Sequence, residues 1–365
     1  MQEQQELEPV RVGVIGLGGI GVAHLKAYAQ LPDVRVVAGV EPAEERGREV
    51  AAAYNVPDLY TNYEELLARD DIDAVDVCVP NYLHAPIGIA ALQAGKHVLC
   101  EKPLALSGDE AKKMVDAAER AGCVLQVAFN HRRRGDAQVL KRYIDEGGLG
   151  RIYYAKAYWM RRSGIPGLGS WFTSKKLAGG GPLIDLGVHI LDLAMYLLGE
   201  PEIRTVSAAT YAELGPRGLG GHTSWVKSGG GNTYEVEDLA TAFIRLQDGG
   251  TLLLEASWAT HSSAGDDFGV VLYGAEGGAE IAVKNYGWED TLRIFKNIGG
   301  RPADIAPRVT RGEGHLGVMR EFVASIRSGQ DPVRGGLEGL RRARIIDAIY
   351  AAAEQGREIV LPPDR

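Results

Sequence analysis

The feature that most constrains this chain is a glycine-rich turn near its start, Gly16-Leu17-Gly18-Gly19-Ile20-Gly21. The β-branched run at 11–16 predicts a strand before the turn, and residues 20–31 have helical spacing after it. Glycines permit a tight turn and a close backbone approach, while a helix N-terminus offers N–H donors to an anion. We therefore expect a Rossmann domain that holds a dinucleotide pyrophosphate. The expected contacts are Gly16, Gly18, Gly19, Ile20 and Gly21.

An acidic residue, Glu41, follows the second predicted strand at 34–40. At this place a carboxylate can accept hydrogen bonds from both ribose hydroxyls, and it repels a 2′-phosphate. Residues 42–45 supply no cation that could accept such a phosphate, and Arg46 is the nearest one. Glu41 therefore favours NAD over NADP. If Glu41 were only a solvated strand end, it would predict no such preference.

The chain of 365 residues is too long for one ordinary compact core, so we expect two domains. In residues 10–129, short β-branched runs alternate with helical stretches, which is typical of a parallel doubly wound sheet. After residue 129 the strands are joined by turns, as in antiparallel hairpins. The predicted strands are 151–161, 202–214, 238–261 and 268–283, and the predicted helices are about 136–146, 183–198, 315–328 and 334–355. The fold class expected is an α/β Rossmann domain followed by an α+β domain, 130–314, with a mostly antiparallel open-faced sheet.

Composition excludes several classes of partner. A net charge of -8 argues against nucleic acid, which would require a basic face. The only strongly basic run, 131–134, suits a local anion contact or a solvated face. No apolar run approaches the roughly 18 residues that span a bilayer, and the first nine residues do not resemble a secretion signal. The three cysteines, Cys78, Cys100 and Cys123, lie in apolar runs without metal-type spacing. We expect a cytoplasmic protein with no metal, membrane or nucleic-acid partner.

Two further stretches can carry chemistry. Lys102 ends a predicted strand in CEKP (100–103), at the sheet edge where ligands bind, although a lysine there is usually a surface residue. Asp185 and His189 are four residues apart on a predicted helix and therefore share a face. The same pair could be a helix-start acid and a core histidine. It could also form half of a metal site, but no further ligands are evident.

Four blocks of sequence together resemble the glucose–fructose oxidoreductase, inositol dehydrogenase and rhizopine-catabolism (Gfo/Idh/MocA) oxidoreductases. The resemblance runs from about residue 10 to 360, and it rests on GLGGIG, on residues 78–106, on FNHRRR (129–134) and on GGGPLIDLGVHILDL (179–193). It implies that Lys102, Asp185 and His189 are catalytic and meet in a cleft between the domains. It implies that Pro80, Asn81, His84, Glu101 and Lys102 lie at the cofactor. It also implies that a C-terminal segment, about 315–365, packs back on the first domain, and that the open sheet forms a homodimer or homotetramer.

The chemistry of these side chains fits oxidation of a secondary alcohol. A free imidazole titrates near pH 6.5, so His189 suits removal of the hydroxyl proton, and Lys102 can stabilise the developing alkoxide. Either could be the immediate base, because coupled groups share their titration. Asp185 can hold a substrate hydroxyl or tune His189. We also expect a cis peptide bond between Lys102 and Pro103.

The substrate is constrained less tightly. Arg132, Arg162 and Trp171 are the candidate contacts, and His261 is a weaker one; otherwise the loop at 161–175 is packed surface. Arginine donors and a stacking tryptophan suit a polyhydroxylated ring. The expected function is therefore NAD-dependent oxidation of a secondary hydroxyl on a sugar, sugar derivative or cyclitol. The alternatives are an NADP-dependent or tightly bound-cofactor enzyme, action on another substrate such as a dihydrodiol, and a non-catalytic dinucleotide sensor.

Overall fold

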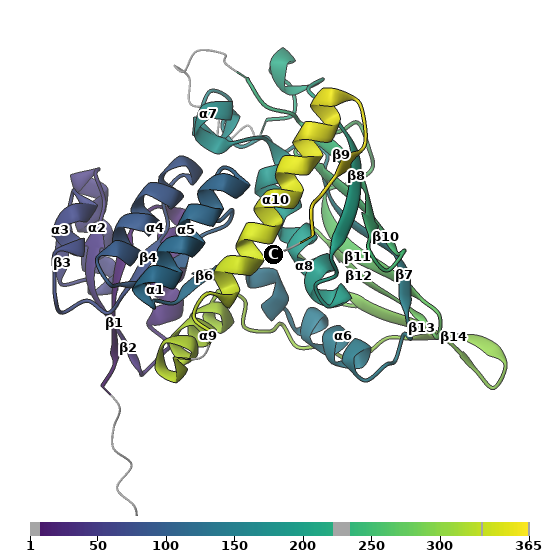
Figure 1. The fold of residues 1–365 in the computed structure, drawn as a ribbon, viewed down its shortest axis with the longest axis horizontal. Coiled ribbons are helices and arrows are strands. Elements are labelled where there is room, and N and C mark those ends of the chain that lie inside the picture. Colours follow the sequence, from purple (N-terminus) through teal and green to yellow (C-terminus); the bar gives the residue numbers. More distant parts are fainter. Residues whose placement is uncertain (1–7, 222–233, 330, 364–365) are drawn as a thin grey trace, which may run out of the picture. The chain divides into compact units, whose positions relative to one another are not determined.

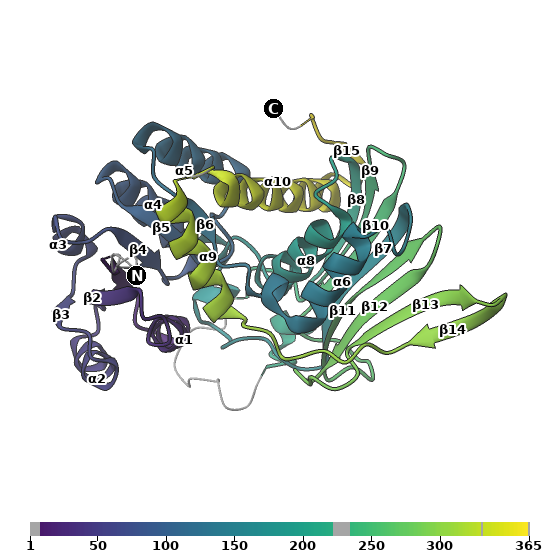
Figure 2. The same ribbon diagram turned by 90° about the horizontal axis from the view of Figure 1, so that it is seen from below.

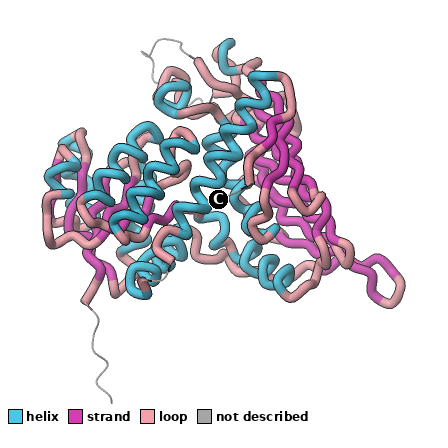
Figure 3. The backbone as a smooth tube through the Cα atoms, in the orientation of Figure 1, coloured by secondary structure: helices cyan, strands magenta, loops and turns pink. Residues whose placement is uncertain are grey.

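A computed structural model describes residues 8–221, 234–329 and 331–363 of the chain. Most of the polar N-terminal tail considered above, residues 1–7, lies outside that part. The chain divides into two compact units. Unit 1 contains residues 1–130 and 313–341, and unit 2 contains residues 131–312 and 342–365. Figure 1 labels the helices and strands, and Figure 3 distinguishes them by type.

Unit 1 is built on a parallel sheet with the strand order β3-β2-β1-β4-β5-β6. Its strands are β1 (Val10–Ile15), β2 (Val34–Val40), β3 (Asp58–Tyr60), β4 (Ala74–Val77), β5 (His97–Cys100) and β6 (Leu125–Val127). All residues of β4 are buried, as expected of a strand covered on both faces. The strand order reverses between β1 and β4, and ligands of such sheets bind outside the carboxyl ends of the strands at that point. The predicted Rossmann fold is confirmed.

The helices of unit 1 cover this sheet. They are α1 (Gly19–Tyr28), α2 (Glu44–Tyr54), α3 (Tyr63–Leu67), η1 (Asn81–Leu83), α4 (His84–Gln93), α5 (Gly108–Ala121) and α9 (His315–Ser328). Ser107 begins α5 by accepting a hydrogen bond from the Glu110 N–H, a standard N-cap. The late helix α9 contributes Met319 and Phe322 to the same apolar core as Tyr28 of α1. A segment far along the chain thus completes the first core.

Unit 2 is built on a nine-stranded sheet with the order β14-β13-β12-β11-β7-β10-β9-β8-β15. Its strands are β7 (Ile152–Arg161), β8 (Ile203–Tyr211), β9 (Leu239–Leu246), β10 (Thr251–Ser257), β11 (Asp266–Gly274), β12 (Gly278–Lys284), β13 (Leu292–Ile298), β14 (Arg301–Ile305) and β15 (Ile359–Val360). Neighbouring strands are antiparallel except for the pair β7–β10. Buried and less buried residues alternate along β9 and β12, which is the pattern of a sheet with one covered face. The predicted mostly antiparallel sheet is confirmed.

The helical elements of unit 2 include those that carry the candidate catalytic residues. They are η2 (Asn130–Arg133), α6 (Gly135–Asp145), η3 (Trp171–Thr173), α7 (Lys175–Ala178), the π-helical turn η4 (Leu183–Gly187), α8 (Val188–Leu198) and η5 (Gly215–Arg217). Figure 2 shows α6 and α8 on the same face of the sheet. The segment Lys175–Leu198 is long and apolar enough to cross a membrane by length and composition alone. However, 78% of its apolar window is buried, as in a core helix.

Three details differ from the sequence-based expectations. The predicted helix at 183–198 begins as the π-helical turn η4, a local insertion that apolar spacing does not reveal. The strands β13, β14 and β15 were not predicted. The last helix, α10 (Arg334–Gln355), crosses the division between the units, and residues 342–365 group with unit 2 instead of packing wholly on the first domain. The reason is that β15 pairs with β8 and that Arg342 forms an ion pair with Asp192.

Candidate functional site

The glycine turn at the end of β1 contains two kinds of glycine. Gly16 has a φ of +94°, and a Cβ atom there would overlap the Cys78 carbonyl oxygen. A Cβ atom on Gly21 would likewise overlap the Gly16 carbonyl oxygen. A Cβ atom on Gly18 or Gly19 would instead meet nothing within 4 Å. The protein's own packing therefore requires Gly16 and Gly21, while Gly18 and Gly19 leave open space.

The start of α1 is also suited to an anion. Its N-cap, Gly18, has no side chain that could accept from the first N–H groups, and the first turn contains no acidic residue. Ile20 follows in this first turn and is partly exposed. Free N–H donors, the helix dipole and open space beside Gly18 and Gly19 fit a pyrophosphate. The residues present thus fit the dinucleotide that the motif predicts.

Glu41 lies directly after β2 and is only 2% exposed. Its Oε1 accepts a hydrogen bond from the Ala43 N–H at 3.0 Å and pairs with Arg46 Nη2 at 2.6 Å. The Arg46 side chain is 55% exposed. Arg46, the nearest cation in the sequence after Glu41, is thus paired with the Glu41 carboxylate.

Two loops leave the carboxyl ends of β4 and β5. After β4, Asn81 begins η1 and His84 begins α4; both are buried, whereas Pro80 just before them is partly exposed. The His84 ring lies 2.6 Å from the Pro103 carbonyl oxygen and 2.8 Å from that of Val79, so it links the two loops. Burial lowers the pKa of His84. These contacts indicate that His84 holds the two segments in place, and its position at the cofactor stays a prediction.

Lys102 stands out from its surroundings by exposure. Between Val98 and Ala105, all residues are buried except Lys102, which is partly exposed. Its backbone N–H donates to Glu101 Oε2 at 3.0 Å, and the peptide bond to Pro103 is cis, as predicted. Glu101 is 5% exposed. The strand end therefore presents one cationic side chain above a buried carboxylate.

Asp185 and His189 show the same contrast in unit 2. In residues 181–190 they are the two partly exposed positions, and all the others are buried. The turn before them is held by Glu237, whose carboxylate accepts from the Gly181 and Leu183 N–H groups at 3.0 and 3.1 Å. A Cβ atom on Gly181 would overlap the Glu237 carbonyl oxygen, which explains the glycine there. The segment thus fixes an acid and an imidazole as its accessible groups.

Several side chains around this pair were missed by sequence reasoning. Trp258 is fully buried, and its Nε1–H donates to Asp185 Oδ2 at 2.9 Å. The Trp159 ring lies 5.7 Å from the His189 ring, and the His131 ring lies 4.9 Å from it. The aromatic neighbours orient the two polar groups. Of these neighbours, only His131 was mentioned in the sequence analysis, as part of the basic run 131–134.

Arg161 is the most informative residue that sequence reasoning missed. Its Nε donates to Asp266 Oδ2 at 2.8 Å, and its Nη2 donates to the Tyr286 hydroxyl at 2.9 Å. Burial acts to lower its pKa, but Tyr286, Asp266 and, more weakly, Asp185 raise it overall. The field of Asp185 thus reaches Arg161. The alternation of β7 could have revealed this, because the buried Trp159 lies two positions earlier on the strand.

The substrate contacts proposed from the sequence lie in different settings. Arg132 is bound to Asp192 through both Nε (2.7 Å) and Nη2 (2.5 Å), a geometry that favours a structural role. Arg162 and His261 are exposed. Trp171 is partly exposed and stacks on Phe172, with ring centroids 3.9 Å apart. Arg161, which was not proposed from the sequence, lies close enough to Asp185 for the two charges to interact. Lys102 belongs to unit 1.

Comparisons with known proteins cover nearly the whole chain. Residues 10–129 match the Gfo/Idh/MocA oxidoreductase family model with an NAD-binding Rossmann fold, and residues 137–280 match the C-terminal domain model of that family. D-glucoside 3-dehydrogenase of Escherichia coli is 32% identical over 99% of this chain and 100% of its own length. Myo-inositol 2-dehydrogenase of Thermotoga maritima is 26% identical over 96% of this chain and 98% of its own length.

Solved structures agree with these matches. Levoglucosan dehydrogenase in complex with NADH and L-sorbose has a TM-score of 0.86 and is 28% identical, over 98% of this chain and 100% of its own. By sequence, the levoglucosan dehydrogenase of Pseudarthrobacter phenanthrenivorans is 31% identical over 98% of this chain and 99% of its own length. The likeness therefore includes both units and is not confined to the common Rossmann fold.

Proposed function

Since this chain belongs to the Gfo/Idh/MocA family of NAD-binding oxidoreductases, we propose that it oxidises a ring secondary hydroxyl of a sugar, sugar derivative or cyclitol. The observation that carries the proposal is the accessible pair Asp185 and His189 on an otherwise buried segment. An acid and an imidazole on one face suit proton removal from a hydroxyl. Relatives that match the chain over its length act on a glucoside, levoglucosan and myo-inositol by their names, which supports the substrate class.

In the proposed mechanism, bound NAD supplies the acceptor for the hydride. His189 takes the hydroxyl proton, while Asp185, held by Trp258, accepts a hydrogen bond from a neighbouring hydroxyl or from the imidazole. The Lys102 ammonium donates to the oxygen that becomes an alkoxide and so lowers the barrier. The cofactor contacts proposed are the open side of the glycine turn, Glu41 at the ribose, and the loops that contain Pro80 and Asn81.

We assign substrate specificity to Arg161 and Tyr286 in addition to the loop residues Arg162 and Trp171. Arg161 is held at a fixed position by Asp266 and Tyr286, and its guanidinium retains donors for ring hydroxyls. Arg132 is set aside, because Asp192 occupies two of its donors. A fixed cation near Asp185 suits a polyhydroxylated or acidic ring and does not suit an apolar dihydrodiol.

A panel of sugars, glycosides and cyclitols tests the proposal with the full-length protein. NADH formation is followed by absorbance, with NAD and NADP in parallel reactions. We expect turnover of at least one cyclic polyol with NAD and a much weaker signal with NADP, since Glu41 would face the 2′-phosphate. NAD binding without turnover of any member would instead indicate a dinucleotide sensor. A preference for NADP would reject the role of Glu41.

The assembly belongs to the proposal as well. We propose a cytoplasmic homodimer or homotetramer that associates through the open face of the nine-stranded sheet. Exposed aromatic side chains on that sheet, Tyr211 on β8 and Tyr273 on β11, support an interface. The acidic net charge of -8 gives no support to a nucleic-acid partner. Light scattering on the purified protein checks the state, and a monomer at all concentrations would contradict it.

A further inference from the structure

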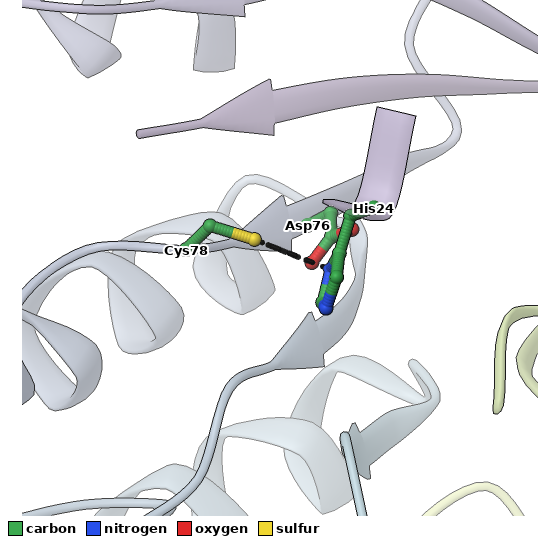
Figure 4. A group of neighbouring side chains, drawn as sticks. All are labelled: His24, Asp76 and Cys78. Carbon is green, nitrogen blue, oxygen red and sulfur yellow. Dashed lines mark hydrogen bonds and ion pairs between the residues drawn. The ribbon is translucent and has the colours of Figure 1, made fainter. Parts of the chain in front are cut away.

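A buried charged cluster in unit 1 is not used by the mechanism above. It consists of His24 on α1, Asp76 on β4, Cys78 just after β4, and Glu101 just after β5. His24 and Asp76 are fully buried, and Glu101 is 5% exposed. Figure 4 shows the Cys78 sulfur directed toward the His24 ring, with the Asp76 carboxylate beside that ring. Two carboxylates in the same interior repel each other and require a compensating positive charge.

His24 supplies that charge through both ring nitrogens. Nδ1 lies 2.8 Å from Asp76 Oδ2, and Nε2 lies 3.0 Å from Glu101 Oε1. A neutral imidazole has one N–H and could donate to only one of them, leaving a lone pair against the other carboxylate. An imidazolium donates to both. Burial acts to lower the pKa of His24, but the charge and hydrogen-bond interactions with Asp76 and Cys78 together outweigh it, and the pKa lies well above the ordinary value.

The cluster does not fit a metal ion, although its side chains are ligand types. Two tetrahedral zinc ligands lie about 3.3 Å apart, whereas the distance from Nδ1 to Oδ2 here is the 2.8 Å of a hydrogen bond. Asp76 and Glu101 also lie on opposite nitrogens of one ring, so His24 cannot direct both at one ion. The Cys78 thiol lies 3.4 Å from Asp76 Oδ1, and burial raises its pKa, which keeps it protonated.

The cluster is connected to the candidate catalytic residue Lys102 through Glu101. Glu101 uses Oε1 for His24 and Oε2 for the Lys102 backbone N–H at 3.0 Å. His24 itself stands on α1 three residues after Gly21, so the helix that begins at the glycine turn also contacts the strand end of Lys102. Burial acts to raise the pKa of Glu101, but the hydrogen bond and the charge of His24 lower it to about 2. Glu101 thus remains an anion.

We propose that His24 is a positioning residue: as an imidazolium between Asp76 and Glu101, it fixes the carboxylate that holds the backbone of Lys102. The inference rests on the proposed function, since it assumes that Lys102 contacts the reacting oxygen. The other charged groups that face Glu101 are His315 of α9, 4.0 Å from Oε1, and Lys102 itself. Burial lowers the pKa of His315, so His24 is the main source of positive charge.

The first test compares the holoenzyme with His24→Gln, which keeps a polar side chain but cannot become charged. We expect kcat to fall about tenfold, because a displaced catalytic group costs rate, while the Kd for NADH changes by less than about threefold. We also expect the kcat–pH profile to acquire a new loss toward acid, because the pKa of Glu101 rises once burial is unopposed. A profile with the wild-type shape would overturn the proposal. The double variant with His315→Gln should steepen the loss.

Two matched controls separate the alternatives. Cys78→Ala removes the thiol 3.2 Å from His24 Nδ1, and we expect an unchanged kcat–pH profile. A metal centre would instead lose activity with Cys78→Ala and release zinc, which would overturn the proposal. His97→Gln removes a ring that accepts the Val124 N–H at 2.9 Å, and it controls for lost stability. It should lower the melting temperature without a new acid limb.

A spectroscopic test does not depend on turnover or on the folding of a variant. The ring ¹⁵N signals of His24 in the NADH-bound wild type should show two protonated nitrogens at mildly alkaline pH. A neutral tautomer in an active enzyme would reject the positioning role alone. Absence of turnover on every polyol, together with a charged ring, would reject the proposed function while the charge of His24 stands.

Discussion

Each unit buries an ion network next to its candidate catalytic residues, and the two networks differ in the cation at the centre. In unit 1 the centre is the His24 imidazole, between Asp76 and Glu101. In unit 2 it is the Arg342 guanidinium, 1% exposed, which donates to Asp192 at 3.0 Å and to Glu200 at 2.5 Å. A guanidinium stays charged at any physiological pH, whereas the charge of an imidazole depends on its neighbours.

The two networks are expected to have different roles: the arginine network is structural, whereas the effect of the histidine network depends on the charge of His24. Asp192 lies on α8 three residues after His189, and Arg132 and Arg342 bind it from η2 and α10. This network fixes the helix that carries His189, and its central guanidinium stays charged at any physiological pH. The network in unit 1 fixes the strand end of Lys102 only while His24 is charged. Variants in the arginine network of unit 2 should change stability. Variants in the histidine network of unit 1 should change activity and its pH dependence.

The largest expected effect comes from breaking the arginine network. Arg342→Met removes the fully buried cation and leaves Arg132 to pair with Asp192 and Glu200, and loss of one partner of a buried pair costs about 3–5 kcal/mol. Urea unfolding measures the loss, with NADH binding as a check on unit 1. Arg334→Met is the control on the same helix, because the Arg334 side chain is 75% exposed although it pairs with Glu338. A loss of less than about 1 kcal/mol would contradict the scaffold role.

The next effect concerns the chemistry itself. Lys102→Ala and His189→Ala should each lower kcat by about 10²-fold or more, while NADH still binds. Steady-state kinetics on the polyol found in the panel measure the change. Lys112→Ala, which removes an exposed lysine paired with Asp116, should retain wild-type turnover. Near-normal turnover of either active-site variant would refute its assigned role.

A smaller effect tests the substrate contact proposed at Arg161. Arg161→Ala should raise KM for the polyol about tenfold, since a charged hydrogen-bond donor is lost. Arg162→Ala, the neighbouring exposed arginine, should change KM much less. Comparing the two KM values shows whether Arg161 contributes more to substrate binding than Arg162. Equal increases in KM would contradict the assignment of Arg161 as the main substrate contact.

The smallest effect is acid sensitivity of the folded state. The pKa of Glu101 is about 2, below the ordinary 4.5, so its contribution to stability is present above pH 4.5 and lost as pH falls toward 2. Melting temperatures measured over that range should fall less steeply for Glu101→Gln than for wild type. Cys78→Ala should leave this slope unchanged, because burial raises the pKa of the Cys78 thiol and it does not titrate there. Parallel curves for wild type and Glu101→Gln would contradict the charge state of Glu101.

Local patterns were sufficient for the fold and for the accessible polar residues. The glycine turn predicted strand, turn and helix, and helical spacing placed Asp185 and His189 on one side. The contact between His24 and Glu101 joins residues 77 apart, and it depends on the parallel register of β4 and β5, which one sequence does not encode locally. The ion pair of Arg132 could not be predicted for a similar reason, since its partner Asp192 is 60 residues away. β13, β14 and β15 were missed because they are short or lack clean alternation.

The two kinds of glycine in the turn after β1 have a practical consequence. Alanine at Gly16 or Gly21 collides with the backbone, so such alleles report on folding. Alanine at Gly18 or Gly19 meets no protein atom within 4 Å, so its methyl group would occupy space needed only by the dinucleotide. We therefore expect Gly19→Ala to fold like the wild type and to lose coenzyme binding, so that phenotypes caused by loss of the coenzyme can be separated from those caused by loss of the folded protein.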